Sequence, residues 1–368
     1  MSSGRPNRPD SGSWGRPLRL VLRLLVIGVG LGVITGTALK LLAPRLSGVG
    51  LPPPRISPGA DPLAPLARGL GRNASLGRFE PRLELGELSR RWAALAAAQK
   101  GLKATGFLLV LDDGRYAQLQ PDVPLPAASS IKSPILLAAL EELDGGKLFW
   151  NEPLILSKEV IGAGAGWMAS RPPGTRFPLF EAATEMIRVS DNSATNLLIK
   201  RLGGKVAVNA RFAALGLTAT QVRNWLPDLD GTNTTSSRDL ARTFALVETG
   251  EKLSPRARDR YRGIMGTSRT NTLIPLGILK GIGGAEVADP DSELLARGIT
   301  VLNKTGDIGI AYADAGLIEL PNGQRAVAAF MVKGPFNDPR STDLIRAMAG
   351  AAAKTLVGGA EATPPKAP

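Results

Sequence analysis

The 368-residue sequence predicts an α+β domain, in which an antiparallel sheet is flanked by helices and joined to an all-helical lobe, with one transmembrane helix ahead of it. Three observations predict this organisation. Strand-like patterns occur at residues 105–120 and return at 298–334. Helical patterns dominate residues 129–261, between the two strand-rich parts. A strongly apolar segment lies near the N-terminus. We expect the two strand-rich parts to share one sheet and the segment between them to form the lobe.

Residues 20–40 are predicted to be a transmembrane signal-anchor. Residues 24–39 are uncharged, and a helix of 16 to 20 residues spans about 24–30 Å, close to the thickness of a bilayer core. The basic segment 1–19 favours a cytoplasmic N-terminus and an exported domain. The alternative is a signal peptide that is cleaved after residues 36–38. This segment contains a G-x-x-x-G series, Gly28, Gly32 and Gly36. Such a series can pack two helices into a homodimer.

Composition excludes several classes of protein. The chain has 45 Lys and Arg against 32 Asp and Glu, a net charge of +13, and more than half of this excess precedes residue 60. No basic block with interleaved aromatic residues follows, so we expect no nucleic-acid partner. There is no cysteine and no histidine. Disulfides and a Ser-His-Asp triad are therefore excluded, and neither a metal nor an organic cofactor is expected.

The catalytic domain is expected at residues 81–358, between a Pro- and Gly-rich linker at 41–80 and a disordered tail at 359–368. Its first element is an amphipathic helix within residues 83–101, rich in Ala and Leu. A hairpin that turns at Asp113-Gly114 follows. The remaining expected elements are irregular segments at 161–178 and 224–237, strands at 298–306, 311–320 and 324–334, and a final helix at 341–358.

Three short motifs carry the candidate chemistry: Ser129-Ser130-Ile131-Lys132, Ser190-Asp191-Asn192 and Lys304-Thr305-Gly306. Residues at i and i+3 share a helical face, so the first motif selects Ser129, because Ser130 has no lysine three residues later. Each motif alone arises often by chance. Together they occur once each, at a helix start, between two helices and at a strand end, which favours a common site.

Lys132 is the candidate base for Ser129 in a chain without histidine. A lysine with its ordinary pKa of about 10.4 is a poor base. Desolvation or a nearby cation lowers that pKa, and Lys304 is a candidate for such a cation. A serine at a helix N-terminus also lies where backbone N–H groups and the helix dipole favour a developing anion.

These motifs form the S-x-x-K, S-D-N and K-T-G set of penicillin-interactive serine acyltransferases. From about residue 83 to 357, the chain resembles the class A β-lactamases and the penicillin-binding proteins closest to them. The resemblance implies a β-lactamase/transpeptidase-like fold with Ser129 as the acylated nucleophile, Lys132 as its base or relay and Ser190 as proton donor to the leaving group. The resemblance also implies that Asn192 binds the amide of the acyl group. Lys304 and Thr305, of the motif that ends at Gly306, would bind the substrate's carboxylate. The backbone N–H groups of Ser129 and Asp307 would form the oxyanion hole.

The pattern departs from class A β-lactamases in the loop at 224–237. Leu226 stands where those enzymes have the glutamate that activates the deacylating water, and Asp230 stands where they have an asparagine. Leucine at this position resembles a group of low-mass, β-lactamase-like penicillin-binding proteins described from cyanobacteria. The alternative is that Asp228 supplies the carboxylate, although a shift of two residues would move it away from the water. Arg269 is the candidate for a further contact with the substrate's carboxylate.

The resemblance implies a membrane-anchored serine D-alanyl-D-alanine peptidase, either a carboxypeptidase or a transpeptidase. We expect its domain on the outer side of a bacterial cytoplasmic membrane, with residues 20–40 as the anchor. Its partners would be a peptidoglycan stem peptide or a β-lactam. One alternative is a class A β-lactamase that hydrolyses β-lactam antibiotics, and a second is a non-catalytic cell-wall-binding protein.

Overall fold

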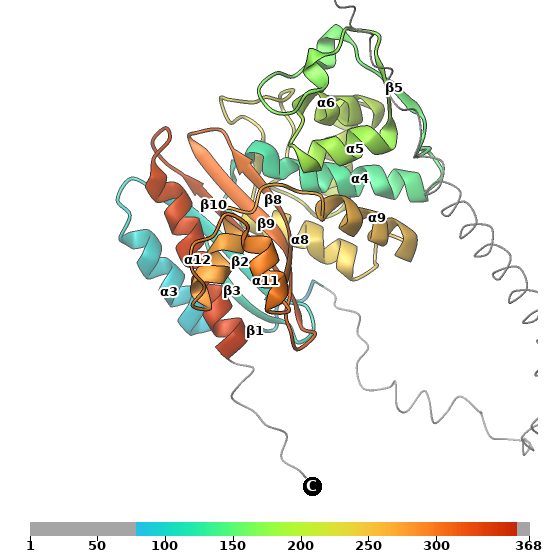
Figure 1. Ribbon diagram of the computed structural model, residues 1–368. Coiled ribbons are helices and arrows are strands. Elements are labelled where there is room, and N and C mark those ends of the chain that lie inside the picture. The colour runs from blue at the N-terminus through green and yellow to red at the C-terminus, as the bar shows by residue number, and fades with distance from the viewer. Residues whose placement is uncertain (1–78, 359–368) are drawn as a thin grey trace, which may run out of the picture. The chain divides into compact units, whose positions relative to one another are not determined.

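The computed structural model describes residues 79–358 (Figure 1). The expected basic N-terminus, signal-anchor, glycine series, almost all of the linker and the C-terminal tail lie outside the described residues. Within residues 79–358, no helix is both long enough and apolar enough to cross a membrane.

The central sheet has six strands in the order β1-β3-β2-β10-β9-β8. Its members are β1 (Leu83–Glu84), β2 (Lys103–Val110), β3 (Arg115–Leu119), β8 (Thr300–Asp307), β9 (Ala311–Glu319) and β10 (Arg325–Lys333). Antiparallel pairing of β2 with β10 joins the N-terminal and C-terminal parts of the domain in one sheet, as the sequence predicted. The hairpins β2–β3 and β9–β10 are also antiparallel.

The sheet is mixed, so the prediction of a purely antiparallel sheet was wrong at one edge. The two residues of β1 pair in parallel with β3, and the expected helix begins after them as α3 (Gly86–Ala97). The backbone N–H of Leu85 donates to the carbonyl of Tyr116 at 2.6 Å, which extends this pairing. Hydrogen bonding to an exposed sheet edge has therefore overridden the local helical pattern of residues 83–84.

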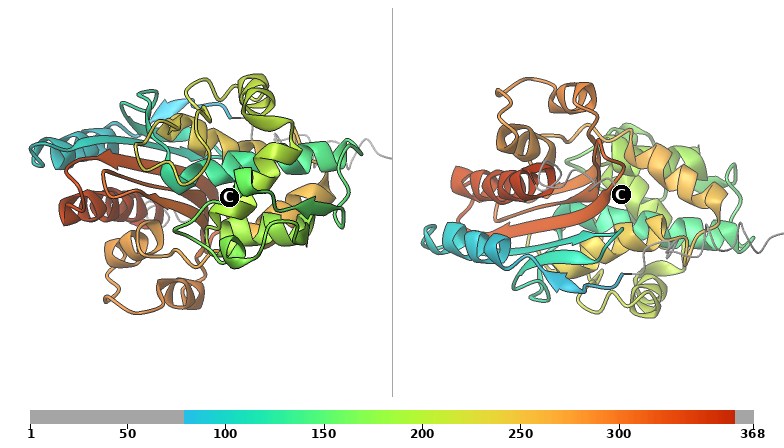
Figure 2. Two further views of the ribbon diagram at one scale, coloured as in Figure 1. Left: turned by 90° about the horizontal axis from the view of Figure 1, so that it is seen from above. Right: turned by 90° about the horizontal axis from the view of Figure 1, so that it is seen from below.

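Helices cover both faces of the sheet. Along β2, side chains alternate between two cores, with Phe107 and Leu109 in one and Leu108 and Val110 in the other. The second core is closed by α3, α10 (Ile274–Gly281), α11 (Pro290–Ala296) and α12 (Pro339–Gly358), and the first by α8 (Ser237–Glu248). Figures 1 and 2 show α3 and α12 side by side, and the indole N–H of Trp92 donates to the Met348 carbonyl at 2.9 Å.

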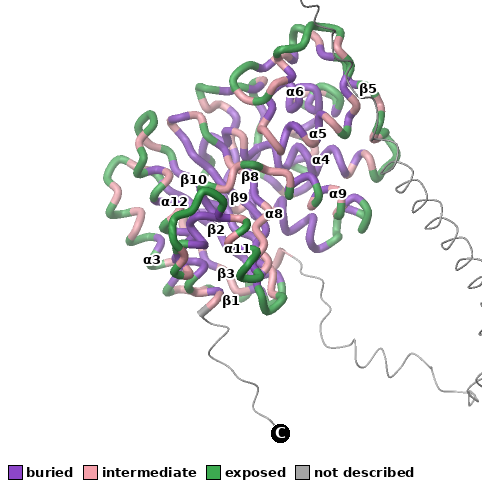
Figure 3. The backbone as a smooth tube through the Cα atoms, in the orientation of Figure 1, coloured by how far each residue is buried: buried purple, intermediate pink, exposed green. Residues whose placement is uncertain are grey.

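The helical lobe is built around α4 (Lys132–Asp144), whose residues from Ser133 to Leu140 are all buried (Figure 3). Its other helices are α5 (Leu179–Arg188), α6 (Asn192–Arg201), α7 (Gly204–Ala214) and α9 (Pro255–Met265). Short elements complete the chain: β4 (Leu125–Pro126) pairs with β7 (Thr234–Thr235), β5 (Pro153–Ile155) pairs with β6 (Arg176–Pro178), and the 3-10 turns are η1 (Ala128–Ile131), η2 (Lys158–Val160) and η3 (Met168–Ser170).

The three motifs meet where the sheet joins the lobe. Ser129 lies in η1 directly before α4, the S-D-N motif connects α5 to α6, and the K-T-G motif lies in β8 at the sheet edge. Both β8 and β9 contact η1. Short turns and strand ends thus bring residues from three distant parts of the chain into one site.

Candidate active site

Ser129 is the serine that faces Lys132. The Lys132 Nζ atom lies 3.0 Å from the Ser129 Oγ atom, whereas the neighbouring Ser130 hydroxyl donates to the Ala127 carbonyl at 2.6 Å. The residue before Ser129, Ala128, has φ = 46°, in the left-handed region that side chains with a Cβ rarely adopt. Such strain is often stored at functional sites, and here it precedes the candidate nucleophile.

The Lys132 amine contacts three motif residues. Its Nζ atom lies 2.5 Å from the Ser190 carbonyl oxygen, 3.0 Å from the Ser190 Oγ atom and 2.9 Å from Asn192 Oδ1. The two carbonyl-type oxygens only accept, so they take two N–H groups. A neutral amine has two hydrogens and one lone pair, and its lone pair would then face the hydroxyls of Ser129 and Ser190. The arrangement suits a base that takes a proton from one hydroxyl and returns it through the other.

Burial favours this neutral form. Lys132 is fully buried, and the loss of hydration lowers its pKa well below the ordinary value of a lysine. The positive charge of Lys304 lowers this pKa further, as expected from the sequence, while the carboxylate of Asp191 opposes the shift. Lys132 is therefore a stronger candidate for a base than an exposed lysine.

Asp314, for which the sequence indicated no role, is a buried carboxylate whose charge acts on Lys304. Burial lowers the pKa of Lys304 to about 8, and the nearby carboxylate of Asp314 acts in the opposite direction. Burial raises the pKa of Asp314 to about 6, although it accepts hydrogen bonds from Asn303 Nδ2 and from the Ile274 backbone N–H, both at 2.8 Å. At pH 7 most Lys304 is therefore protonated and most Asp314 ionised. The available signal was one aspartate in the middle of a mostly apolar strand.

Gly306 allows β8 to approach the nucleophile. A Cβ atom on Gly306 would lie 2.7 Å from the Ser130 backbone nitrogen and 2.9 Å from that of Ser129. This close approach places the backbone of the next residue, Asp307, beside the turn that carries Ser129. The Asp307 carboxylate accepts from the Gly309 N–H at 2.7 Å, so its side chain is engaged in the following turn.

The backbone of Leu226 is fixed at both polar groups by one side chain. Its N–H donates to Asn196 Oδ1 at 2.9 Å, and its carbonyl accepts from Asn196 Nδ2 at 2.7 Å. The Leu226 side chain is 4% exposed and lines a cavity of about 160 Å³ together with Ser129 and Asn192. Residue 226 therefore lines the same cavity as the candidate nucleophile, and its side chain is apolar.

The carboxylate of Asp228 is used by its own loop. One oxygen accepts from the Asn233 backbone N–H at 2.6 Å and the other from the Thr232 hydroxyl at 2.8 Å. Both contacts shape the loop, which argues against Asp228 as a free base for a water, although the residue also lines the cavity. Asp230 is exposed.

Arg269 is an exposed residue in a half-buried segment beside the K-T-G strand. Its backbone N–H donates to the Arg188 carbonyl at 3.3 Å. The carbonyl of the next residue, Thr270, accepts from the Thr305 hydroxyl at 3.2 Å and from Asn303 Nδ2 at 2.8 Å. The structure thus holds the Arg269 backbone within one residue of a contact to Thr305.

Asp191 and Asn192 fix the loop on the other side of the cavity. Asp191 caps α6 through the Ala194 N–H at 2.9 Å and accepts from the N–H groups of Trp167 and Met168 at 2.7 and 2.8 Å. Asn192 Nδ2 donates to the Ala163 carbonyl at 2.8 Å. The sequence indicated no role for Asp191 or Asn196 beyond their place in or near the S-D-N motif.

This fold, with a serine beside a buried lysine at the junction of sheet and lobe, is the fold of class A β-lactamases and related penicillin-binding proteins. Residues 87–356 match the model of the Beta-lactamase enzyme family. The chain therefore belongs to that family, which confirms the resemblance inferred from its motifs.

Individual relatives fall into two groups. The solved structure of PBP-A is 40% identical, covers 76% of this chain and 100% of its own, and superposes with a TM-score of 0.70. A structure of a leucine-to-glutamate variant of PBP-A, in an acyl-enzyme complex with penicillin G, is 39% identical with a TM-score of 0.69, covering 76% of this chain and 99% of its own. An ancestral class A β-lactamase of Gram-negative bacteria shares the fold at 23% identity, with a TM-score of 0.62 and coverage of 73% and 99%.

Among curated relatives, a β-lactamase of Streptomyces albus G is 28% identical over 206 residues. That alignment covers 53% of this chain and 65% of the enzyme, so the chain spans slightly less than two thirds of this relative.

Proposed function

We propose that the protein is a penicillin-binding serine D-alanyl-D-alanine peptidase, a carboxypeptidase or transpeptidase that acts on peptidoglycan stem peptides. The observation that carries the proposal is an acylation site without a deacylation base. Ser129 lies 3.0 Å from a buried lysine amine, yet residue 226, which lines the same cavity, is a leucine. An enzyme with this site would form an ester readily and release it slowly to water.

The proposed reaction passes through an ester on Ser129. The neutral Lys132 amine takes the Ser129 proton as Oγ attacks the carbonyl carbon of the penultimate D-Ala. Backbone N–H groups of Ser129 and Asp307 stabilise the oxyanion. Ser190 then gives its proton to the departing D-Ala nitrogen and regains one from Lys132, so the proton taken from Ser129 ends on Ser190 and Lys132 is neutral again. Water or an amine attacks the ester and restores Ser129.

Asn192 and Lys304 would orient the substrate in this scheme. Asn192 would hydrogen-bond the acyl amide, and the protonated Lys304 with Thr305 would hold the terminal carboxylate, which Arg269 would also contact. A β-lactam would acylate Ser129 in the same way, but its leaving group stays attached to the acyl moiety, and Leu226 offers no base for water. The likeness to PBP-A, of which a variant was captured as a penicillin G acyl-enzyme, supports this proposal.

Fluorescent penicillin and a D-Ala-D-Ala pentapeptide test the proposal. We expect one label per chain with a lifetime of many minutes, and D-Ala release from the pentapeptide by mass spectrometry, with a cross-linked product when an amine acceptor is present. A chromogenic cephalosporin should show a stoichiometric burst and little further turnover. Rapid multiple turnover, without D-Ala release, would identify the protein as a β-lactamase instead.

A class A β-lactamase is the second candidate, favoured by the family model and by curated relatives that bear this name. It requires a water activated by a group other than Leu226. Because both carboxylate oxygens of Asp228 are bound within the loop, this candidate has no evident base.

The pH dependence of acylation tests the role of Lys304. Its pKa of about 8 means that its charge is present below pH 8 and lost above it. If this charge holds the substrate's carboxylate, the second-order rate constant of penicillin acylation should fall roughly tenfold per pH unit above about pH 8.5. A Lys304→Arg variant keeps its charge across this range and should lose the alkaline decline. A flat wild-type profile to pH 10 would contradict the role.

We also propose that residues 20–40 anchor the protein in the cytoplasmic membrane, with the catalytic domain outside. The support is the uncharged segment and its basic N-terminal flank. Digestion of the domain by protease added to intact spheroplasts would agree with this placement, and protection of the domain would not.

A further inference from the structure

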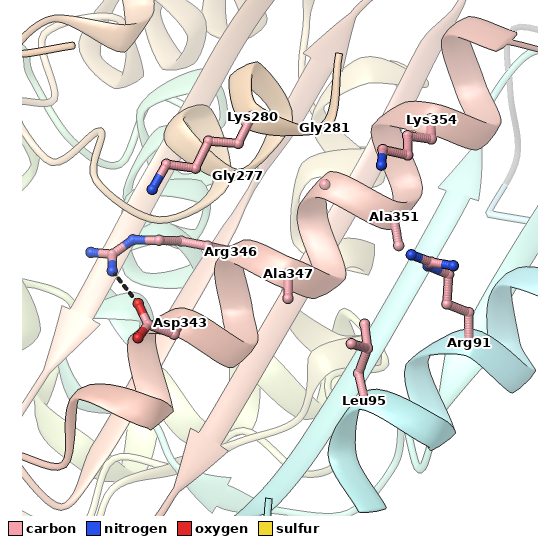
Figure 4. A pocket seen from close by; sticks show the side chains of 11 residues that line it. Arg91, Leu95, Gly277, Lys280, Gly281, Asp343, Arg346, Ala347, Ala351 and Lys354 are labelled. Atoms are coloured by element: carbon pink, nitrogen blue, oxygen red, sulfur yellow. Dashed lines mark hydrogen bonds and ion pairs between the residues drawn. The ribbon is translucent and has the colours of Figure 1, made fainter. Parts of the chain in front are cut away.

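A cationic groove lies between α3, α10 and α12 (Figure 4). Its volume is about 380 Å³. Its lining side chains carry four positive charges and one negative charge: Arg91, Lys280, Arg346, Lys354 and Asp343. Residues 79–358 contain 33 Lys and Arg and 29 Asp and Glu, a net charge of +4. The groove alone therefore accounts for a net +3, and the rest of the described domain is almost neutral.

Small residues create the groove. A Cβ atom on Gly277 of α10 would lie 2.6 Å from the Arg346 carbonyl of α12, and one on Gly281 would collide with the Gly350 backbone. The two helices therefore pack backbone against backbone. Arg346, Gly350 and Lys354 follow each other at four-residue intervals along one face of α12, so the two long cations stand at either side of a glycine, and the neighbouring α12 residues that line the groove between them, Ala347 and Ala351, are small.

Two of the four cations have no counter-charge. Arg346 is paired with Asp343 at 2.8 Å, and Lys280 with the exposed Glu286 at 2.6 Å. Within residues 79–358, no carboxylate lies within ion-pair distance of Arg91 or Lys354. These two side chains come from different helices and lie near the same end of the groove (Figure 4). Uncompensated like charges repel, so this arrangement is more favourable with an anion between them.

The four cations are spread along the groove. Arg346 and Lys354 are eight residues apart on α12, so the helix rises about 12 Å between them at 1.5 Å per residue. An anion held by Arg91 and Lys354 leaves Arg346 and Lys280 with only the exposed carboxylates of Asp343 and Glu286, and exposed ion pairs are weak enough for further anionic groups to replace them. No aromatic side chain lines the groove, so it lacks the stacking surface typical of single-strand nucleic-acid sites. The groove thus fits several anionic groups on one chain.

We infer that this groove binds a linear polyanion, a polymer with phosphodiester or similar phosphate groups along an extended backbone. Guanidinium groups bind phosphate through paired N–H donors, and lysine supplies point charges beside them. The groove lies on α3 and α12, which pack in the second core. In contrast, η1 and α4 pack in the first core, on the other face of the sheet. The domain can therefore hold the polymer while Ser129 remains accessible to a substrate.

Binding of long-chain polyphosphate by the full chain tests this inference. The Arg91→Ala/Lys354→Ala variant should raise the dissociation constant at least tenfold at low salt and reduce the slope of log K against log salt by about two. The matched control, Arg90→Ala/Lys252→Ala, removes two exposed cations outside the groove and should leave binding within about twofold. Penicillin labelling should be unchanged in both variants, which separates this test from that of the catalytic proposal.

Four results would overturn the inference. Absence of wild-type binding, or equal losses in the two double variants, would show that the groove is no specific site. Inorganic phosphate that binds as tightly as the polymer would indicate a single-anion site. Binding to vesicles with anionic phosphatidylglycerol, without binding to polyphosphate, would assign the surface to a membrane.

Discussion

A Ser129→Ala variant will form no covalent adduct with penicillin. Ser129 Oγ is the hydroxyl that lies 3.0 Å from Lys132 Nζ while also facing the cavity, so its loss removes the only positioned nucleophile of the proposed mechanism. Loss of a catalytic nucleophile lowers turnover on the order of 10⁴-fold or more. Intact-protein mass spectrometry after incubation with penicillin G measures the adduct directly.

Ser130→Ala is the matched control, because the two serines are adjacent and equal in size. The Ser130 hydroxyl donates to Ala127, so its removal should cost about 1 kcal/mol of unfolding free energy and leave the labelling in place. Unchanged labelling in Ser129→Ala, or its loss in Ser130→Ala alone, would show that both the mechanism and the motif register are wrong. A thermal melt of each variant separates lost chemistry from lost folding.

A Leu226→Glu variant will release the penicilloyl group faster, by about 10²-fold. General-base assistance by a positioned carboxylate contributes rate factors of this order. Residue 226 lines the cavity beside Ser129, and burial there will raise the pKa of the introduced carboxyl toward neutrality, where it is an effective base. The measured quantity is the decay rate of the acyl-enzyme after excess penicillin has been removed.

Leu226→Gln has the size of the glutamate without its charge, and its acyl-enzyme should remain as long-lived as that of the wild type. Equal acceleration in both variants would mean that disruption of the apolar packing, and not base catalysis, admits water. No acceleration in either would mean that the loop excludes the water, or that Asp230 in place of an asparagine fails to hold it.

Contacts between residues that are close in the sequence could be predicted from it. The three-residue interval between Ser129 and Lys132 is a property of one helical turn, so it predicts a contact without knowledge of the fold. The hairpin at Asp113-Gly114 likewise depends on a turn between neighbouring strands, and it was confirmed. The repulsive effect of Lys304 on Lys132 was expected because the two motifs belong to one known set of residues, not because their distance in space was evident.

Non-local relations could not be predicted. The charge of Asp314 acts on Lys304 only because β8 pairs with β9, and a single aspartate in a strand does not indicate where its carboxylate points. The two bonds that engage Asp228 depend on the path of an irregular loop. Helices α10 and α11 were not predicted. Helix α10 is only eight residues long and apolar nearly all round, so its sequence has no clear hydrophobic period.

The hydrogen bonds from the Asn196 side chain to both polar backbone groups of Leu226 have an evolutionary consequence. The path of the main chain at this point is set by a neighbour's amide and not by the side chain of residue 226 itself. An exchange at position 226 can therefore alter the fate of the acyl-enzyme without rebuilding the loop. A wall-modifying enzyme and an antibiotic-degrading one would then differ, at this position, by the replacement of one amino acid and not by a change of the fold.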